Sequence, residues 1–319
     1  MKPIHDNRRK LELKHHEKLF TRGTRHVFHY ENLYGAVPFV KLILAMTFLR
    51  KPGLRNAESL ALNKVELRLK TLPAGFDGCR LLLITDTHFG SIDNFAEKII
   101  SIAERADYDY CILGGDYSLR FYRGHWRGEL DKLARFLKAG SRVFAVLGNH
   151  DDYATAEQLH GHGVEVLTNE HVCLESGGDK IYLVGIDDCH YYAAAELQEA
   201  QEGIADGAFK ILISHSPELY AEAAQAGFSL YLAGHTHAGQ LCLPGGIVLM
   251  SRTPGPRMLV KGLWKHNDMV GYTSAGAGSA GVAARFFCPP ELALLTLVRD
   301  GNSGQKTANP QNFRKNHGN

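Results

Sequence analysis

Apolar residues in the first half of the chain are arranged as short buried strands that alternate with amphipathic helices. Runs long enough for a strand with both faces buried occur at 81–85, 109–113 and 143–147. Between these runs, residues 95–105 and 130–137 have the apolar spacing of a helix. The alternation of strand and helix predicts a largely parallel sheet with helices packed on it.

The second half of the chain is richer in strands than in helices. Further strands are predicted at 65–69 (a half-exposed edge strand), 164–167, 172–174, 181–186, 210–214, 230–233, 247–250, 271–273 and 292–297. We therefore expect an α/β fold with a layered α+β arrangement, whose chemistry lies at the carboxyl ends of the strands. The polar segment 301–319 is typical of a disordered tail.

The longest apolar run, residues 35–49, precedes this body. From Phe39 to Leu49 it predicts a helix of about 11 residues, roughly 16 Å long, whereas a bilayer core needs about 20 residues. The helix either packs on the following domain or lies in a membrane interface. Flanking basic side chains favour the interface, because they would meet anionic headgroups. They are Arg22, Arg25, Lys41, Arg50, Lys51 and Arg55.

Charge divides the chain at the same place. Residues 1–56 contain twelve Lys and Arg against four Asp and Glu, a net charge of +8, which leaves −6 for the remainder of a chain with +2 in total. We expect a basic N-terminal arm at 1–60 and a catalytic domain at 61–300. The charge of the arm fits either an anionic membrane surface as its partner or a solvated tail. The acidic body argues against a nuclease and a nucleic-acid partner. Six cysteines without a Cys-x-x-Cys pair favour a reducing cytoplasm. Together with the basic arm, this predicts a cytoplasmic protein that is peripheral on the inner face of the cell membrane.

Five of the predicted strands end in residues that bind divalent metal ions. The first ends at Asp86 and His88, an oxygen and a nitrogen ligand for a borderline cation. The others end at Asp116, at Asn149 and His150, at His215, and at His235 and His237. One histidine after a strand is more often structural, but five such ends in one chain, most after a glycine that permits a sharp turn, argue for a site. These eight groups can hold two ions if one carboxylate bridges them.

In order and spacing, these strand ends resemble the five motifs of the calcineurin-like metallophosphoesterases. The motifs are Asp86-x-His88, Gly115-Asp116, Gly148-Asn149-His150-Asp151, His215 and Gly234-His235-x-His237. The resemblance covers roughly residues 75–300 and implies a four-layer αββα sandwich. Finer features resemble a bacterial branch of membrane-associated phosphodiesterases and pyrophosphatases. They are Leu72-Pro73, Gly114-Gly115-Asp116-Tyr117, Gly185-Ile186-Asp187-Asp188, Ser214-His215-Ser216-Pro217, and Arg285 followed by Pro289-Pro290-Glu291.

The resemblance also implies the ligands of each metal. One ion would be held by Asp86, His88, Asp116 and His237, and the other by Asp116, Asn149, His215 and His235. His150 would then lie over the phosphate. Many family members have an acidic residue three positions after the bridging Asp, oriented towards the catalytic His, where this chain has Leu119. Asp151 or a backbone carbonyl could orient His150 instead. The ligands suit Mn, Fe or Zn, and we favour Mn.

These residues predict a hydrolase that cleaves a phosphodiester or pyrophosphate bond. Two ions roughly 3.5–4 Å apart could share a water and lower its pKa, and the resulting hydroxide would attack phosphorus. His150 would stabilise the charge or protonate the leaving group. Asp187, Asp188 and Arg285 are candidate substrate-binding residues, and the aromatic and basic loop 120–127 is a candidate substrate-side loop.

The expected substrate is a phosphorylated small molecule or a lipid-linked compound near a membrane. An alternative is a UDP-2,3-diacylglucosamine pyrophosphohydrolase of lipid A synthesis, since one member of the wider group has that activity. A binding scaffold without catalysis is disfavoured, because such a protein should have lost ligands or the catalytic histidine, and none is missing here.

Overall fold

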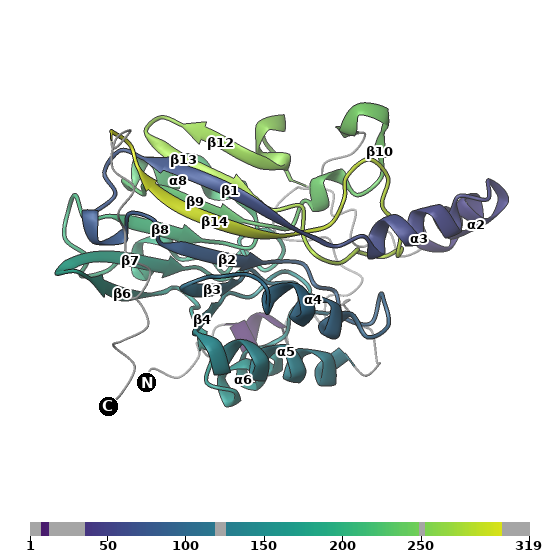
Figure 1. Ribbon diagram of the computed structural model, residues 1–319, viewed down its shortest axis with the longest axis horizontal. Helices are drawn as coiled ribbons and strands as arrows, with labels where there is room; N and C mark the ends of the chain where they lie inside the picture. Colours follow the sequence, from purple (N-terminus) through teal and green to yellow (C-terminus); the bar gives the residue numbers. More distant parts are fainter. Residues whose placement is uncertain (1–7, 13–35, 119–125, 249–252, 302–319) are drawn as a thin grey trace.

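Two six-stranded sheets form the centre of the protein (Figure 1). The structure is a computed structural model, and it describes residues 8–12, 36–118, 126–248 and 253–301. The strand orders are β1-β14-β2-β3-β4-β5 in the first sheet and β12-β13-β9-β8-β7-β6 in the second. The predicted loop 120–127 falls mostly outside the described residues, as does the predicted tail after residue 301.

The first sheet contains the buried strands predicted for the first half of the chain. Its strands are β1 (Ala61–Leu69), β2 (Arg80–Ile84), β3 (Tyr110–Leu113), β4 (Arg142–Ala145), β5 (Glu165–Val166) and β14 (Glu291–Arg299). Strands β2 to β5 are parallel, whereas β14 runs antiparallel to β2 and parallel to β1. Three helices follow these strands: α4 (Phe95–Ala103), α5 (Trp126–Gly140) and α6 (Tyr153–Gly161).

The second sheet is built from the later strands. They are β6 (Glu170–Ser176), β7 (Asp179–Gly185), β8 (Lys210–Ile213), β9 (Leu230–Ala233), β12 (Gly262–His266) and β13 (Met269–Thr273). The central strands β7, β8, β9 and β13 are parallel, and β6 and β12 are antiparallel additions at the edges. Short helices α7 (Leu197–Ala200) and α8 (Tyr220–Gln225) accompany this sheet, and β10 (Cys242–Leu243) pairs with β11 (Ile247–Val248).

Alternate side chains of each strand enter different cores. In β2, Leu81 and Leu83 belong to the core between the two sheets, whereas Leu82 belongs to the core shared with α4 and α5. In β8, Ile211 faces the inter-sheet core and Leu212 a third core that includes residues of α7 and α8. Strands buried on both faces therefore make four layers, and the predicted αββα sandwich is confirmed.

The segment before the first sheet forms two helices, α2 (Ala36–Met46) and α3 (Arg50–Glu58), where we predicted one helix at 39–49. Helix α3 was not predicted because most of its residues are polar. Its Pro52 falls in the first turn, where proline is tolerated because a backbone N–H there would have no partner within the helix. Helix α3 packs on the body through Gly53, whose carbonyl accepts a hydrogen bond from the Arg285 backbone N–H at 3.0 Å. Within the described ranges, no helix is both long and apolar enough to cross a membrane.

Candidate dinuclear metal site

The five motif loops meet at one edge of the sandwich. Loops after β2, β3 and β4 come from the first sheet, and loops after β8 and β9 from the second. Their side chains touch across the two sheets: His88 Nε2 lies 3.0 Å from His237 Nε2, and His215 Nε2 lies 3.2 Å from Asp116 Oδ2. Residues up to 149 positions apart in the chain are thus brought together.

The first group of potential ligands comprises Asp86, His88 and His237. One ligand atom from each lies within 4.8 Å of the others. His237 Nε2 is 3.5 Å from Asp86 Oδ1, and His88 Nε2 is 3.7 Å from Asp116 Oδ2. Two imidazole nitrogens that face each other and a carboxylate suit a shared cation, because facing lone pairs repel unless a proton or a cation lies between them.

The second group comprises Asp116, His215 and His235, again within 4.8 Å. The Asn149 Oδ1 atom lies 3.1 Å from His215 Nε2 and 3.0 Å from His235 Nδ1, so the amide joins this group. Asp116 contacts both groups. The arrangement fits two cations with Asp116 between them, and its oxygen and imidazole donors are suitable for Mn, Fe or Zn.

Most of these ligand candidates occupy a strained backbone conformation. Asp86, His88, Asp116, His235 and His237 have φ values of 53°, 39°, 57°, 69° and 50°. Residues other than glycine seldom adopt this left-handed region, and where they do so together the site is usually functional. The chain accepts the strain because only a sharp turn after each strand brings these side chains into one cluster.

Two glycines make room for the carboxylates of the site. A Cβ at position 148 would lie 2.1 Å from Asp116 Oδ1, and a Cβ at position 234 would lie 2.4 Å from Asp86 Oδ2. Both distances are far inside van der Waals contact. Gly148 and Gly234 therefore precede the ligands because any larger residue would displace a carboxylate.

Asp151 joins the loop after β3 to the loop after β4. Its carboxylate accepts hydrogen bonds from the backbone N–H groups of Asp116 at 2.7 Å, Gly148 at 2.8 Å and Tyr117 at 2.9 Å. Burial raises the pKa of Asp151 to about 7, and the charge of Asp116 adds to the shift. Through these bonds Asp151, a candidate for orienting His150, holds the loop that carries Asp116. The His150 backbone N–H donates to Asp116 Oδ1 at 2.8 Å.

Backbone carbonyls orient two of the histidines. His88 Nδ1 lies 3.0 Å from the Ser118 carbonyl oxygen, and His215 Nδ1 lies 2.9 Å from that of Gly114. A proton on Nδ1 leaves Nε2 available to a metal, an arrangement common around metal-binding histidines. Burial alone would lower the pKa of His215, but the neighbouring Asp116 outweighs burial and raises that pKa to about 10.

Arg285 occupies a different place from the substrate-binding position that we expected. Its side chain is completely buried. The guanidinium donates to the backbone carbonyls of Ala275 at 2.8 Å and Cys288 at 3.3 Å, and its Nη2 lies 3.2 Å from His237 Nδ1. Arg285 therefore supports the loop around His237, because its donors are engaged inside the protein.

Asp187 and Asp188 are buried as well, at 3% and 1% exposure. Asp187 Oδ1 accepts a hydrogen bond from Arg8 Nη1 at 2.5 Å. The Asp188 carboxylate accepts from the backbone N–H groups of Tyr191 at 2.7 Å and Tyr192 at 2.6 Å. Both carboxylates thus hold the loop after β7, which differs from the substrate contacts suggested by the sequence.

Two features of the site were missed from the sequence. His190, Glu218 and His235 form a third group of ligand atoms within 4.8 Å, and His190 Nδ1 is hydrogen-bonded to the Glu218 carboxylate. His190 lies outside the five motifs, and its place two residues after Asp188 in a strand-end loop is the signal that could have found it. The second feature is Arg8, which no local pattern distinguishes from the other basic residues of the arm.

Comparison with known proteins agrees with this geometry. A family model described as calcineurin-like phosphoesterase matches residues 79–239, which include every ligand candidate above. The uncharacterized metallophosphoesterase YkoQ of Bacillus subtilis is 27% identical over 267 residues, covering 79% of this chain and 95% of that relative. The phosphodiesterase YaeI of Escherichia coli is 26% identical and covers 69% of this chain and 82% of its own length. A Helicobacter pylori metallophosphoesterase is 29% identical over 69% of this chain, which spans 60% of that relative.

Proposed function

Because the chain belongs to the calcineurin-like phosphoesterase family and is a metal-dependent phosphoesterase, we propose that it hydrolyses a phosphodiester or pyrophosphate bond. Asp86, His88, Asp116 and His237 would hold one divalent ion. Asp116, Asn149, His215 and His235 would hold the second, and Mn²⁺ is the ion we favour. When bound, such a pair supplies a water of lowered pKa and positive charge for the phosphoryl oxygens.

The exposure of His150 is the observation that carries this proposal. The seven ligand candidates are each at most 2% exposed, whereas the His150 side chain is 11% exposed. His150 Nε2 lies 3.9 Å from Asp116 Oδ2, next to the carboxylate that contacts both ligand groups. A partly exposed imidazole beside the metal cluster is suited to stabilise phosphoryl charge or to give a proton to the leaving oxygen. Burial alone would raise the pKa of Asp116, but His215 and His150 outweigh it and hold that pKa well below its usual value.

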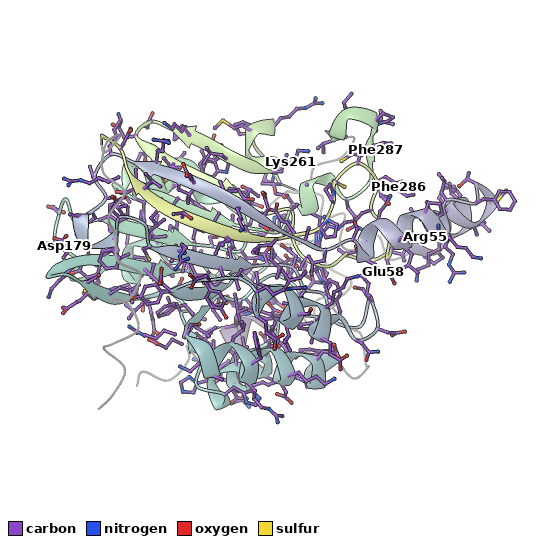
Figure 2. All side chains as sticks on the ribbon, in the orientation of Figure 1. Arg55, Glu58, Asp179, Lys261, Phe286 and Phe287 are labelled. Atoms are coloured by element: carbon purple, nitrogen blue, oxygen red, sulfur yellow. The ribbon has the colours of Figure 1, made fainter. Side chains whose placement is uncertain are left out.

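The N-terminal helices support a membrane-proximal substrate. Apolar side chains of α2 are exposed, with Phe39 at 62%, Leu42 at 55% and Met46 at 70%. In Figure 2, α2 and α3 project from one end of the body, and the labelled Arg55 lies on this projection. Apolar side chains next to basic ones suit an anionic membrane surface, and a lipid-linked substrate would be met there.

A substrate panel tests the reaction. With Mn²⁺ added, we expect turnover of bis(p-nitrophenyl) phosphate that exceeds turnover of p-nitrophenyl phosphate, as the name of the Escherichia coli phosphodiesterase relative suggests. UDP-2,3-diacylglucosamine in the same panel tests the lipid A alternative, which the exposed face of α2 favours. Preference for the monoester would contradict the proposal, and inactivity on all three with metal bound would favour a scaffold.

A further inference from the structure

Arg8 is among the largest fully buried side chains of the described residues, with 1% of its surface exposed. It belongs to a single helical turn at residues 8–12, drawn in purple near the helices of the first sheet in Figure 1. A guanidinium keeps its charge in any protein environment, so its burial requires strong hydrogen-bond and charge partners. The identity of these partners indicates the role of the turn.

The guanidinium of Arg8 bridges the loop that carries Asn149 and His150. Its Nη2 atom donates to the Gly148 carbonyl oxygen at 3.0 Å and to the Asp151 carbonyl oxygen at 2.8 Å. These two carbonyls bracket the metal-ligand candidate and the catalytic candidate. One planar group is therefore bonded to both ends of the loop.

Glu12, one turn later, extends this attachment to helix α6. Its Oε1 atom accepts from Arg8 Nε at 3.0 Å and from the backbone N–H of Tyr153 at 2.9 Å. Tyr153 is the first residue of α6. N–H groups in the first turn of a helix have no partner within the helix, and a carboxylate there is favourable. The loop is thus held at both ends and at the helix that follows it.

The same guanidinium also reaches the second sheet. Its Nη1 atom donates to Asp187 Oδ1 at 2.5 Å in the loop after β7, and its Cζ atom lies over the Tyr192 ring, 3.7 Å from the ring centre. Asp187 Oδ1 further accepts from the backbone N–H of Asp188 at 2.7 Å. Arg8 therefore joins a loop of the first sheet to a loop of the second, and both sheets supply ligand candidates.

We propose that Arg8 is a positioning residue for the phosphoesterase reaction, which makes the N-terminal turn an integral part of the active site. Arg8 holds the loop of Asn149 and His150 against Asp187 and does not touch the substrate. The inference rests on the role proposed above for His150. It assigns the start of the arm to the active site, whereas α2 is the part of the arm suited to a membrane.

Substitution of Arg8 in the full chain tests this role. With saturating Mn²⁺ and bis(p-nitrophenyl) phosphate, Arg8→Ala should lower kcat by about 10-fold or more, the scale seen when a partner of a metal ligand is lost, with little change in KM. Amide hydrogen exchange at residues 148–153 should become faster, and added methylguanidinium should restore part of the kcat. Arg9→Ala removes the same charge from an exposed position of the same turn, and it should change neither kcat nor the rate of hydrogen exchange at residues 148–153.

A double-mutant cycle with His150→Ala separates positioning from a general loss of structure. If Arg8 acts through the loop, Arg8→Ala costs much less kcat in the His150→Ala background than in the wild type. Equal losses in both backgrounds would overturn the inference. Full kcat in His150→Ala overturns the proposed function and this inference together, whereas normal kcat in Arg8→Ala alone overturns only this inference.

If Arg8→Ala does not fold, Arg8→Lys provides the test of the positioning role. Lysine keeps the charge but lacks the planar fork that bonds both carbonyls and Asp187 at once. A folded Arg8→Lys protein with reduced kcat and faster exchange at residues 148–153 supports the inference. A folded Arg8→Lys protein with the kcat and exchange of the wild type overturns it.

Discussion

At the scale of single residues, the metal-ligand candidates are buried, whereas the candidate catalytic side chain lies at the rim of the site. Asp116 is buried between the two ligand groups, and its Oδ2 atom is 3.2 Å from His215 Nε2. His150 lies beside it with 11% of its side chain exposed. The two residues are neighbours in space, but their burial suits one to metal binding and the other to the substrate.

Alanine substitutions should separate these two roles. We expect His150→Ala to keep its metal content and lose turnover by a factor of about 10²–10⁴, the usual contribution of a general acid or base. Asp116→Ala should instead lose metal, because its carboxylate contacts both ligand groups. Metal analysis of the purified variants beside kinetic assays measures both effects, and equal metal loss in the two variants would contradict the assignment.

At the scale of elements, the turn after each strand determines how closely the ligands approach. The left-handed conformation of Asp86, His88, Asp116, His235 and His237 turns the chain within two to four residues of a strand end. Gly148 lies against the Asp116 carboxylate with no space for a side chain. Such turns cost free energy, of order 1–3 kcal/mol for each strained residue, and the packed strands hold them in place.

Gly148→Ala should therefore damage the site. Its Cβ would lie 2.1 Å from Asp116 Oδ1 and displace the carboxylate, so we expect weaker metal binding and a large loss of activity. Gly128→Ala is the matched control, because Gly128 lies inside α5 with nothing within 4 Å of the added Cβ. That control should stabilise the helix by roughly 0.5–1 kcal/mol and leave activity unchanged. Normal metal binding by Gly148→Ala would refute the argument.

Helices α2 and α3 differ in what they contact, which changes how membrane association is best tested. Helix α3 packs on the body through Gly53 and Asn56, whose side-chain amide donates to the Arg285 carbonyl at 2.9 Å. A truncation from residue 57 would remove this contact together with α2. Substitutions confined to the exposed face of α2 are therefore the cleaner test.

We expect Phe39→Ser, Leu42→Ser and Met46→Ser together to reduce binding to vesicles that contain phosphatidylglycerol. Each apolar side chain fully removed from water contributes about 1.5–3 kcal/mol, so binding should fall by at least about 10-fold. Leu263→Ser, at an exposed position of β12, is the control and should bind as the wild type does. Undiminished sedimentation of the triple variant with vesicles would rule out α2 as the contact.

At the scale of the whole molecule, the ligand candidates come from both sheets of the sandwich. His88 belongs to the loop after β2 and His237 to the loop after β9, yet their Nε2 atoms are 3.0 Å apart. A bound metal would link the two sheets in the folded state only. Its binding should therefore stabilise the fold as a whole, in addition to serving the reaction.

Metal removal should accordingly lower the thermal stability. At a free Mn²⁺ concentration 100 times its Kd, one site adds about 2.7 kcal/mol to the free energy of unfolding, so chelation by EDTA should lower Tm by several degrees. Scanning fluorimetry with and without Mn²⁺ measures the shift. Asp116→Ala should show little of it, and a shift of equal size in that variant would mean that the metal stabilises the protein elsewhere.

The buried strands and the parallel sheet of the first half were predictable from the chain because their evidence is local, whereas the four-layer αββα arrangement was implied by the resemblance to the calcineurin-like metallophosphoesterases. Runs such as Leu81 to Ile84 are apolar at every position, and a strand that buries both faces needs a layer on each side. The ligand types at the strand ends were predictable for the same reason, since each follows its strand within a few residues. The strand β12 and helices α3 and α6 were not predicted, because their polar residues hide the periodic pattern.

Local sequence thus determined which residues end the strands, and tertiary structure decided which other side chains support them. Arg285 and Asp187 have residue types that are common in active sites, but their surroundings place them in the interior, against His237 and Arg8. Arg8 itself meets Gly148 from 140 positions away and Asp187 from 179. No periodicity links residues at such separations, because their contact depends on how the two sheets and the N-terminal turn pack together.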